Sequence, residues 1–503
     1  MAREIEAAEA EAGGRPGTDR AGRRSPGFPY PDPPQALDYE LCVHCGMCLD
    51  VCPTYLERGE EVHSPRGRVF LIRQAAEGRL PLDAGLYEAV FQCLDCRACE
   101  TACPSGVPVG RLIEAARGQV VQAMPSRGFR RFVEATLLRG LIPHPRRLDR
   151  AAALLRLYQR SGLARAARAL RLTKLLPPHL RKLERALPAV RRSVRRRYPE
   201  ALPALRPFSP AARAEAAAAA APRSGSEARP PASLAAAASA PAAPPARKPK
   251  PKRPKRVGVF TGCVMDVWYA DVNEATVRVL RENGYDVVIP KDQRCCGALH
   301  VHAGDRETGK ALARANIGAF LSRDVDAIVV NAAGCGAALK EYGHLLAEEP
   351  ERERAEAFAE KVYDVSEFLV RFGFRPPTGR VEATVTYHEA CHLAHAQGIR
   401  EAPRALLRSI PGLRLVEMPE ADHCCGSAGI YNLTHPEMAD ALLRRKVANV
   451  PTEAEAVATG NPGCMLQIAS GLLEAGRRTE VVHTVTLLDR AYRAEANGKE
   501  EAP

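Results

Sequence analysis

Aromatic residues and long apolar runs are both scarce in this 503-residue sequence. Phe, Trp and Tyr together make up 5% of the residues, although the hydrophobic fraction of 46% is ordinary for folded domains. No stretch approaches the run of about 18 apolar residues that a membrane-spanning helix needs. The beginning of the chain also lacks an apolar segment followed by a small-residue cleavage site. We therefore expect a cytoplasmic protein, and leave open a peripheral attachment to the inner face of the membrane.

The lack of an export signal argues against a disulfide framework built from the sixteen cysteines. These cysteines are clustered, and in a reducing compartment clustered cysteines indicate metal ligands or redox groups. The net charge of +13 raises the question of nucleic-acid binding. Much of that charge lies between Arg127 and Lys255, without interleaved aromatic residues that would stack on bases. We interpret this stretch as a tether or docking face and expect no nucleic-acid partner.

Two runs of four cysteines share the spacing C-x₂-C-x₂-C-x₃-C-P, one from Cys42 to Pro53 and one from Cys93 to Pro104. This is the spacing of bacterial ferredoxins with two [4Fe–4S] clusters, in which the fourth cysteine of each run binds the other cluster. The spacing predicts one cluster on Cys42, Cys45, Cys48 and Cys103, and a second on Cys93, Cys96, Cys99 and Cys52.

Zinc is the alternative metal for these two runs, because C-x₂-C also binds Zn²⁺. Zinc, however, requires neither the doubled x₂ spacing nor the trailing x₃-C-P. His44 lies inside the first run and could be taken for a ligand. Since all four cysteines of the run are present, we interpret His44 as a neighbour that tunes the cluster by a hydrogen bond.

The C-terminal half contains the same pattern twice: a β-type segment followed by cysteine, a helix, and a further β-type segment followed by cysteine. The expected strands are residues 257–260, 287–289, 327–331, 384–387, 413–416 and 456–458. The cysteines that follow them are Cys263, Cys295, Cys296 and Cys335 in the first half, and Cys391, Cys424, Cys425 and Cys464 in the second. Alternation of strands and helices predicts parallel sheets, with the cysteines at the carboxyl ends of the strands.

The predicted fold class is therefore multidomain α/β: an α-helical ferredoxin-like two-cluster module, a basic helical segment with a disordered linker, and a duplicated α/β domain with parallel sheets. The predicted divisions are a disordered leader (1–36), the two-[4Fe–4S] domain (37–125), the basic helical segment (126–207), an Ala/Pro-rich linker (208–256), and two cysteine-rich repeats (257–375 and 376–494). Leucines such as Leu154, Leu157 and Leu163 run through the basic segment. They suit helical hairpins packed under the cluster module, or a helix that docks on a membrane surface or partner.

The vicinal cysteine pairs are each followed by glycine, as Cys295-Cys296-Gly297 and Cys424-Cys425-Gly426. Four thiolates gathered at strand ends can bind a cluster or zinc, or carry out thiol–disulfide chemistry. The block FTGCVMDVW at 260–268 resembles the cysteine-rich "CCG" domain of heterodisulfide reductase and its relatives. The blocks QRCCGALHVHAG, NAAGCGAALKEYGHLL, YHEACHLAHAQGI, CCGSAGIYNL and TGNPGC resemble more specifically the iron–sulfur subunit of glycolate oxidase. The resemblance covers about 37–125 and 257–490.

This resemblance implies an electron-transfer subunit that works with flavin-binding glycolate oxidase subunits. Those partners would oxidise glycolate to glyoxylate by hydride transfer to FAD, and electrons would pass through the clusters to a quinone or other membrane acceptor. The sequence offers no convincing dinucleotide fingerprint, so we expect FAD on the partner chains and no hydroxy-acid catalysis by this chain alone.

The sequence departs from the full CCG pattern in one respect. That pattern ends in C-x-x-C, whose last cysteine is a fifth ligand to a noncubane cluster, whereas here Ala338 and Gln467 take that position. A histidine or aspartate could replace the missing ligand. Nearby histidines are His300, His302, His388, His392, His395 and His423. Each is more often a polar loop or core residue, and His392 and His423 are the best candidates because they adjoin cysteines.

Three alternative functions stay open beside the glycolate assignment. Iron–sulfur subunits of lactate oxidation and of anaerobic glycerol-3-phosphate dehydrogenase contain both modules, so the substrate could differ. Thiol–disulfide catalysis of the heterodisulfide-reductase kind is disfavoured by the missing fifth cysteines. The CCG sites could hold a cluster, zinc, or no metal at all.

Overall fold

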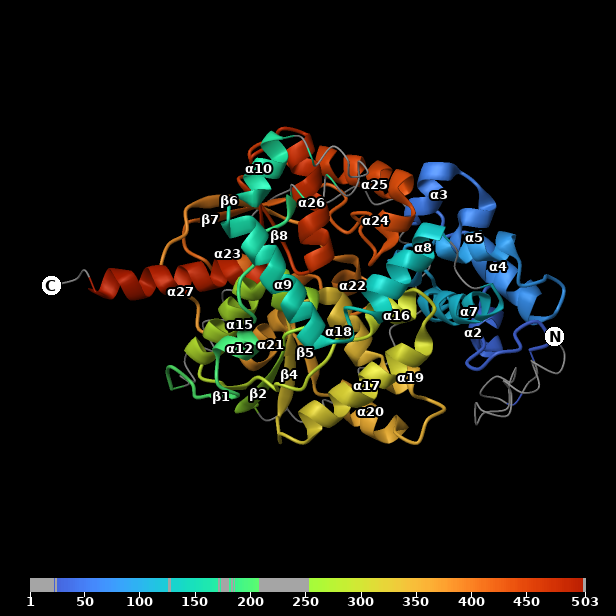
Figure 1. Cartoon of the computed structure of the whole chain (residues 1–503), viewed down its shortest axis with the longest axis horizontal. Helices are drawn as coiled ribbons and strands as arrows, with labels where there is room; N and C mark the ends of the chain where they lie inside the picture. Colours follow the sequence, from blue (N-terminus) through green and yellow to red (C-terminus); the bar gives the residue numbers. More distant parts are fainter. Residues whose placement is uncertain are drawn as a thin grey trace, which may run out of the picture.

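The computed structural model describes residues 22, 25–124, 128–170, 172, 181, 184, 186–207 and 253–500. The N-terminal helices lie at one end of two α/β units (Figure 1), and the C-terminal helix α27 (Thr484–Glu500) extends from the opposite end. None of the helices in these ranges is both long and apolar enough to cross a bilayer.

Short helices around one apolar core form the N-terminal module. They are α2 (Ala36–Glu40), α3 (Pro53–Arg58), the 3₁₀ turn η1 (Glu61–His63), α4 (Pro65–Ala76), α5 (Ala84–Phe91), α6 (Ala98–Thr101) and α7 (Val109–Ala123). Ser64 begins α4 by accepting a hydrogen bond from the Gly67 N–H, and Asp83 caps α5 in the same way. Fully buried Ile72 and Ile113 lie in the core that these helices enclose.

Residues 25–36 pack against the protein, so the prediction of a disordered leader is wrong for this part of 1–36. Phe28 is fully buried in the N-terminal core. Asp32 lies 2.8 Å from the Lys310 ammonium and 3.2 Å from the Arg306 guanidinium, which belong to the first repeat. Sequence periodicity missed this segment because it contributes single buried residues rather than a repeating apolar face. The rest of the predicted leader, apart from Gly22, lies outside the described residues.

The basic segment lies on the first repeat and also reaches the N-terminal module. Its elements are α8 (Gly128–Val133), the π turn η2 (Glu134–Arg139), α9 (Pro145–Arg160), α10 (Leu163–Ala169), α12 (Val194–Arg197) and the strand β1 (Ala201–Leu202). Ala152 of α9 packs with Val190 and with Val267 of the first repeat, while Arg130 lies over the Phe91 ring at 3.9 Å. Because the segment includes the strand β1, it is not purely helical as predicted. Leucines 154, 157 and 163 are exposed on it.

The two repeats contain equivalent sheets, which confirms the predicted duplication and parallel sheets. The first sheet has the order β1-β3-β2-β4-β5, formed by β2 (Arg256–Phe260), β3 (Asp286–Val288), β4 (Ala327–Val330) and β5 (Val362–Asp364). The second has the order β7-β6-β8-β9, formed by β6 (Ala383–Tyr387), β7 (Leu413–Glu417), β8 (Ala456–Thr459) and β9 (Glu480–His483). All pairs are parallel except β1 with β3. Most of the predicted linker, residues 208–252, lies outside the described residues.

Helices cover both sheets and also join the repeats. The first repeat contains α14 (Val264–Trp268), α15 (Ala270–Glu282), α16 (Ala298–His302), α17 (Arg306–Leu321), α18 (Ala333–Lys340), α19 (Tyr342–Leu345), α20 (Arg352–Ala359) and α21 (Val365–Phe372). The second contains α22 (Cys391–Ala394), α23 (Glu401–Arg408), α24 (Tyr431–Thr434), α25 (Pro436–Ala448), α26 (Pro462–Glu474) and α27. The last helix of each repeat packs on the other: α21 contacts α23, and α27 contacts α15. One apolar core therefore spans both repeats.

Phe368 tests this shared core. It is fully buried on α21, with its ring centroid 4.9 Å from that of Tyr285. We expect Phe368→Ala to lower the free energy of unfolding by about 3–5 kcal/mol, because the cavity cannot close completely. Denaturant titration measures this, and hydrogen exchange should rise on α27 of the other repeat as well. The control Leu473→Ala, at a 52% exposed position, should change stability by about 0.5 kcal/mol or less. Destabilisation confined to the first repeat would contradict the shared core.

Candidate metal centres

Four thiols from both ferredoxin-type runs surround a small cavity at the surface. Cys42, Cys45, Cys48 and Cys103 line a space of about 30 Å³, and we call them the exposed thiol set. Cys45 is solvent-exposed, and the other three are partly buried. The Val107 N–H donates to the Cys103 sulfur at 3.5 Å. His44 and Gly46 have φ values of 57° and 86°, so the backbone turns tightly around the first three sulfurs.

The remaining four thiols of the runs surround a second cavity, deeper in the protein. Cys52, Cys93, Cys96 and Cys99 line a space of about 20 Å³, and we call them the buried thiol set. The Asp95 N–H donates to the Cys93 sulfur at 3.4 Å, and the fully buried Arg68 guanidinium lies 3.9 Å from the Cys52 sulfur. Burial raises the pKa of the Cys96 and Cys99 thiols well above the usual value.

Both sets fit a [4Fe–4S] cluster by their donor chemistry. Each combines three cysteines of one run with the fourth of the other, which is the grouping that the spacing predicts. Backbone N–H groups and Arg68 face the sulfurs and would stabilise the negative charge of metal-bound thiolates.

The first CCG set is Cys263, Cys295, Cys296 and Cys335, which are free thiols joined by hydrogen bonds between their sulfurs. Cys263 donates to Cys295 at 3.5 Å. Hydrogen bonds from Cys295 and Cys335 hold the pKa of Cys296 well below its usual range, whereas contact with Cys296 and burial raise the pKa of Cys335. Gly297, with a φ of 89°, turns the chain directly after the vicinal pair. A Cβ atom added at this residue would lie 3.3 Å from the Gly309 carbonyl oxygen.

The second CCG set is Cys391, Cys424, Cys425 and Cys464, and a buried lysine and a buried histidine lie near it. Contact with Cys424 and burial raise the pKa of Cys391 well above its usual range. The fully buried Lys446 lies near enough for the charges of Cys425 and Cys424 to act on its pKa. His388, also fully buried, lies with one ring nitrogen within 4.8 Å of the sulfurs of Cys425 and Cys464.

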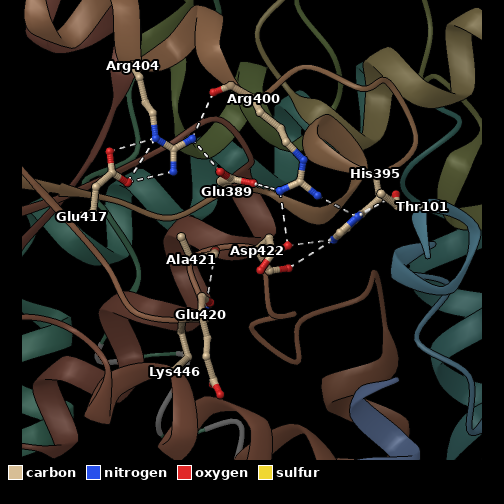
Figure 2. Close-up of polar contacts among 10 residues, drawn as sticks. All are labelled: Thr101, Glu389, His395, Arg400, Arg404, Glu417, Glu420, Ala421, Asp422 and Lys446. Atoms are coloured by element: carbon tan, nitrogen blue, oxygen red, sulfur yellow. Dashed lines mark hydrogen bonds and ion pairs between the residues drawn. The ribbon is translucent and has the colours of Figure 1, made fainter. Parts of the chain in front are cut away.

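Salt bridges fix the two segments that lead into the second CCG set (Figure 2). The Glu389 carboxylate lies 2.5 Å from both Arg400 and Arg404, and Arg400 also reaches Asp422 at 3.2 Å. Glu389 precedes Cys391 and Asp422 precedes Cys424, so one cluster of charges positions both thiols. From the other side, the Lys446 ammonium donates to the carbonyls of residues 420 and 421 at 2.5 and 3.3 Å.

All eight CCG cysteines line a single cavity of about 360 Å³ between the repeats. Apolar side chains from several parts of the chain complete its wall. They include Leu137, Leu141, Ile142 and Leu148 of the basic segment, and Val264, Trp268, Leu299 and Ile430 of the repeats. Sequence reasoning did not assign the basic segment to a site, because its leucines gave no indication of their partner.

The buried thiol set contacts the second CCG set. Cys96 and Cys424 belong to one packed core, with Cys391 against it. The Tyr431 hydroxyl donates to the Gln92 carbonyl at 3.1 Å, across the same junction. A hydrogen bond of 3.0 Å between the Thr101 hydroxyl and the His395 ring joins α6 to the second repeat (Figure 2).

The histidines near the CCG cysteines separate into different roles. The His300 ring donates to the Leu138 carbonyl at 2.8 Å and is therefore a core residue. Burial alone would lower the pKa of His302, but contacts with Asp95 and Glu114 raise it to about 10. The rings of His392 and His423 adjoin cysteines, but among the described residues only His388 is grouped within 4.8 Å of two CCG thiols. The Nδ1 atom of His392 lies 3.5 Å from the Cys391 sulfur, so its position as a candidate stays a prediction. Sequence adjacency did not single out His388, because the end of β6 lies near sulfurs that are distant in sequence.

Family models match three parts of the chain. A "4Fe-4S dicluster domain" matches residues 38–107, and a "Cysteine-rich domain" matches twice, at 257–340 and 385–469. A third model, "Glycolate oxidase iron-sulfur subunit, linker region", matches residues 129–187. The basic segment thus has a counterpart in known proteins, which the sequence analysis did not identify.

Relatives match the chain over most of its length. The "Probable glycolate oxidase iron-sulfur subunit" of Bacillus subtilis is 41% identical over 455 residues, which cover 89% of this chain and 92% of the relative. The "Glycolate oxidase iron-sulfur subunit" of Escherichia coli is 31% identical over 90% of this chain and 94% of the relative. "Lactate utilization protein A" of Oceanobacillus iheyensis is 32% identical over 46% of this chain.

Pairs of substitutions test the exchange of the fourth cysteines between the runs. We expect Cys52→Ala with Cys96→Ala to remove one cluster, about four irons per chain, because both thiols belong to the buried set. Cys52→Ala with Cys45→Ala should remove both clusters, about eight irons, although these two cysteines lie in one run. Iron analysis of anaerobically purified protein measures this, and the reverse result would contradict the exchange.

Proposed function

Because the chain belongs to the family of glycolate oxidase iron–sulfur subunits, we propose that it is the electron-transfer subunit of a flavin-dependent enzyme oxidising glycolate to glyoxylate. The relatives named for this role align over about nine-tenths of the chain, with 41% and 31% identity. Lactate oxidation is the neighbouring alternative, but the relative named for lactate utilization aligns over 46% of the chain. The extent of the alignment therefore favours glycolate.

The arrangement of the thiols supports electron transfer rather than catalysis on the hydroxy acid. When bound, [4Fe–4S] clusters supply one-electron carriers. Cys45 places one thiol set at the surface, while Cys96 brings the other into contact with Cys424. The observation that carries the proposal is this arrangement: one thiol set at the surface, a buried set that shares a packed core with the second CCG set, and a cavity lined by all eight CCG cysteines.

The two ends of this arrangement suggest where the partners bind. Exposed Val43 and Met47 flank Cys45, at 70% and 59% exposure, and form the apolar surface on which we place the flavin-binding subunit. FAD would belong to that subunit, because the sequence of this chain offers no dinucleotide fingerprint. At the far end, the apolar wall of the shared cavity suits a quinone or another apolar acceptor.

Thiol–disulfide catalysis has less support. Such exchange requires an accessible thiolate. The Cys296 thiol, whose pKa is lowered, is buried, and contact with neighbouring sulfurs and burial raise the pKa of Cys335 and Cys391. Four thiols gathered at the strand ends of each repeat are a donor set that suits a cluster or zinc. We therefore propose a cluster or zinc at the CCG sets.

Reconstitution tests the proposed function. The chain purified alone should contain about eight cubane irons in its ferredoxin-type sets and should oxidise no glycolate. Addition of flavin-binding glycolate oxidase subunits should produce glyoxylate with reduction of an artificial or quinone acceptor. The same mixture assayed with lactate is the matched control for the substrate. Glycolate turnover by the chain alone, without flavin, would contradict the proposal.

Met47→Glu tests the docking surface. A buried carboxylate at an apolar interface would be desolvated without a partner, so we expect about tenfold weaker binding of the flavin subunit, about 1.4 kcal/mol. Binding is measured by titration against steady-state acceptor reduction, with iron content unchanged. Leu473→Glu, at another exposed apolar position, is the control and should leave binding intact. Equal effects of the two substitutions would place the interface elsewhere.

A further inference from the structure

His388 is buried where the second CCG set meets the sheet. It follows β6 directly, and its backbone N–H donates to the Ala458 carbonyl of β8 at 2.9 Å. The side chain is fully buried. Neither ring nitrogen has a hydrogen-bond partner among the described residues.

An imidazole in this state needs an explanation. A neutral ring carries one donor and one acceptor, and burial without partners removes their hydration without replacing it. Buried polar atoms in native proteins are nearly always paired, and a bound ion is one way of pairing them. A nitrogen of His388 and the sulfurs of Cys425 and Cys464 all lie within 4.8 Å of one another. One nitrogen therefore faces two thiols that we have already assigned to a metal.

The first repeat provides an internal comparison. Phe260 takes the corresponding position, three residues before Cys263, as His388 is three residues before Cys391. It is 1% exposed and packs near the Phe320 ring, with centroids 6.0 Å apart. An apolar ring thus satisfies the packing at this strand end, so the imidazole in the second repeat serves another purpose.

The charge around the second CCG set is consistent with a neutral ligand. Lys446 is fully buried and lies close to Cys424 and Cys425. Its ammonium is held by two backbone carbonyls rather than by a carboxylate. An imidazole in place of a fifth thiolate removes one negative charge, and Lys446 offsets part of what remains.

We propose that His388 is a ligand of the metal or cluster at the second CCG set, in place of the cysteine that is absent at Gln467. The inference rests on the proposed presence of metal at that set. The two repeats then differ in ligation: the first has thiols alone, and the second has thiols with one imidazole. Histidine ligation raises the reduction potential of an iron–sulfur centre relative to cysteine, so with iron–sulfur clusters at both sets the second set would be the better electron acceptor of the two.

Spectroscopy on the full chain tests this ligand. Protein purified anaerobically with ¹⁴N- or ¹⁵N-histidine is first analysed for iron and zinc beyond the about eight irons of the ferredoxin-type sets. If the additional metal is iron, pulsed EPR should detect nitrogen coupling that changes with the isotope. If it is zinc, X-ray absorption should detect one nitrogen at about 2.0–2.1 Å beside sulfur ligands.

Substitutions assign the nitrogen to a residue. His388→Cys should keep the additional metal and lose the nitrogen signal, which a packing role for the ring does not predict. His388→Phe, the residue of the first repeat, should keep the fold by circular dichroism and lose at least half of the additional metal. The control His144→Asn, at an exposed position of the basic segment, should keep both metal and signal.

Two results would overturn the inference. One is a nitrogen signal that persists in His388→Cys. The other is a wild-type chain with no metal beyond the about eight ferredoxin irons. The second result would leave the proposed electron transfer through the ferredoxin-type sets intact, because the reconstitution experiment measures that function separately.

Discussion

The contact between the loop of residues 93–99 and the two repeats is the constraint on which the rest of the structure depends. Arg97, at 4% exposure of its side chain, forms ion pairs with Glu114 of its own module and with Glu341 of the first repeat. Because a buried ion pair that loses one partner costs about 3–5 kcal/mol, this junction holds the module in one position. It places Cys96 in the same packed core as Cys424, so the buried thiol set and the second CCG set adjoin.

The same junction makes the two repeats unequal despite their common fold. Apart from the edge strand β1, both sheets have the same strand order, and both CCG sets open on one cavity. Among the described residues, however, only the second set shares a packed core with the buried thiol set, and there a histidine takes the position that Phe260 has in the first repeat. Duplication therefore supplied two similar sites, and their surroundings gave them different properties.

Local patterns in the sequence predicted much of this arrangement. The parallel sheets and the duplication are confirmed, because short β-type segments followed by cysteine and alternating with helices can be recognised one strand at a time. The ferredoxin spacing also predicted which thiols lie together, since a tight turn determines their order; their role as ligands stays a prediction. What the sequence could not predict depends on contacts between distant segments. Asp32 with Lys310, β1 at the edge of the first sheet, and His388 over Cys464 are examples.

The central claim is that glycolate electrons pass through the cysteine sets of this chain. Freeze-quench EPR of the complete complex, mixed anaerobically with glycolate and without acceptor, tests it most directly. Our account predicts that iron–sulfur signals change within the first turnover, after the flavin is reduced. Consumption of glycolate and reduction of flavin while the iron–sulfur signals stay unchanged would contradict it.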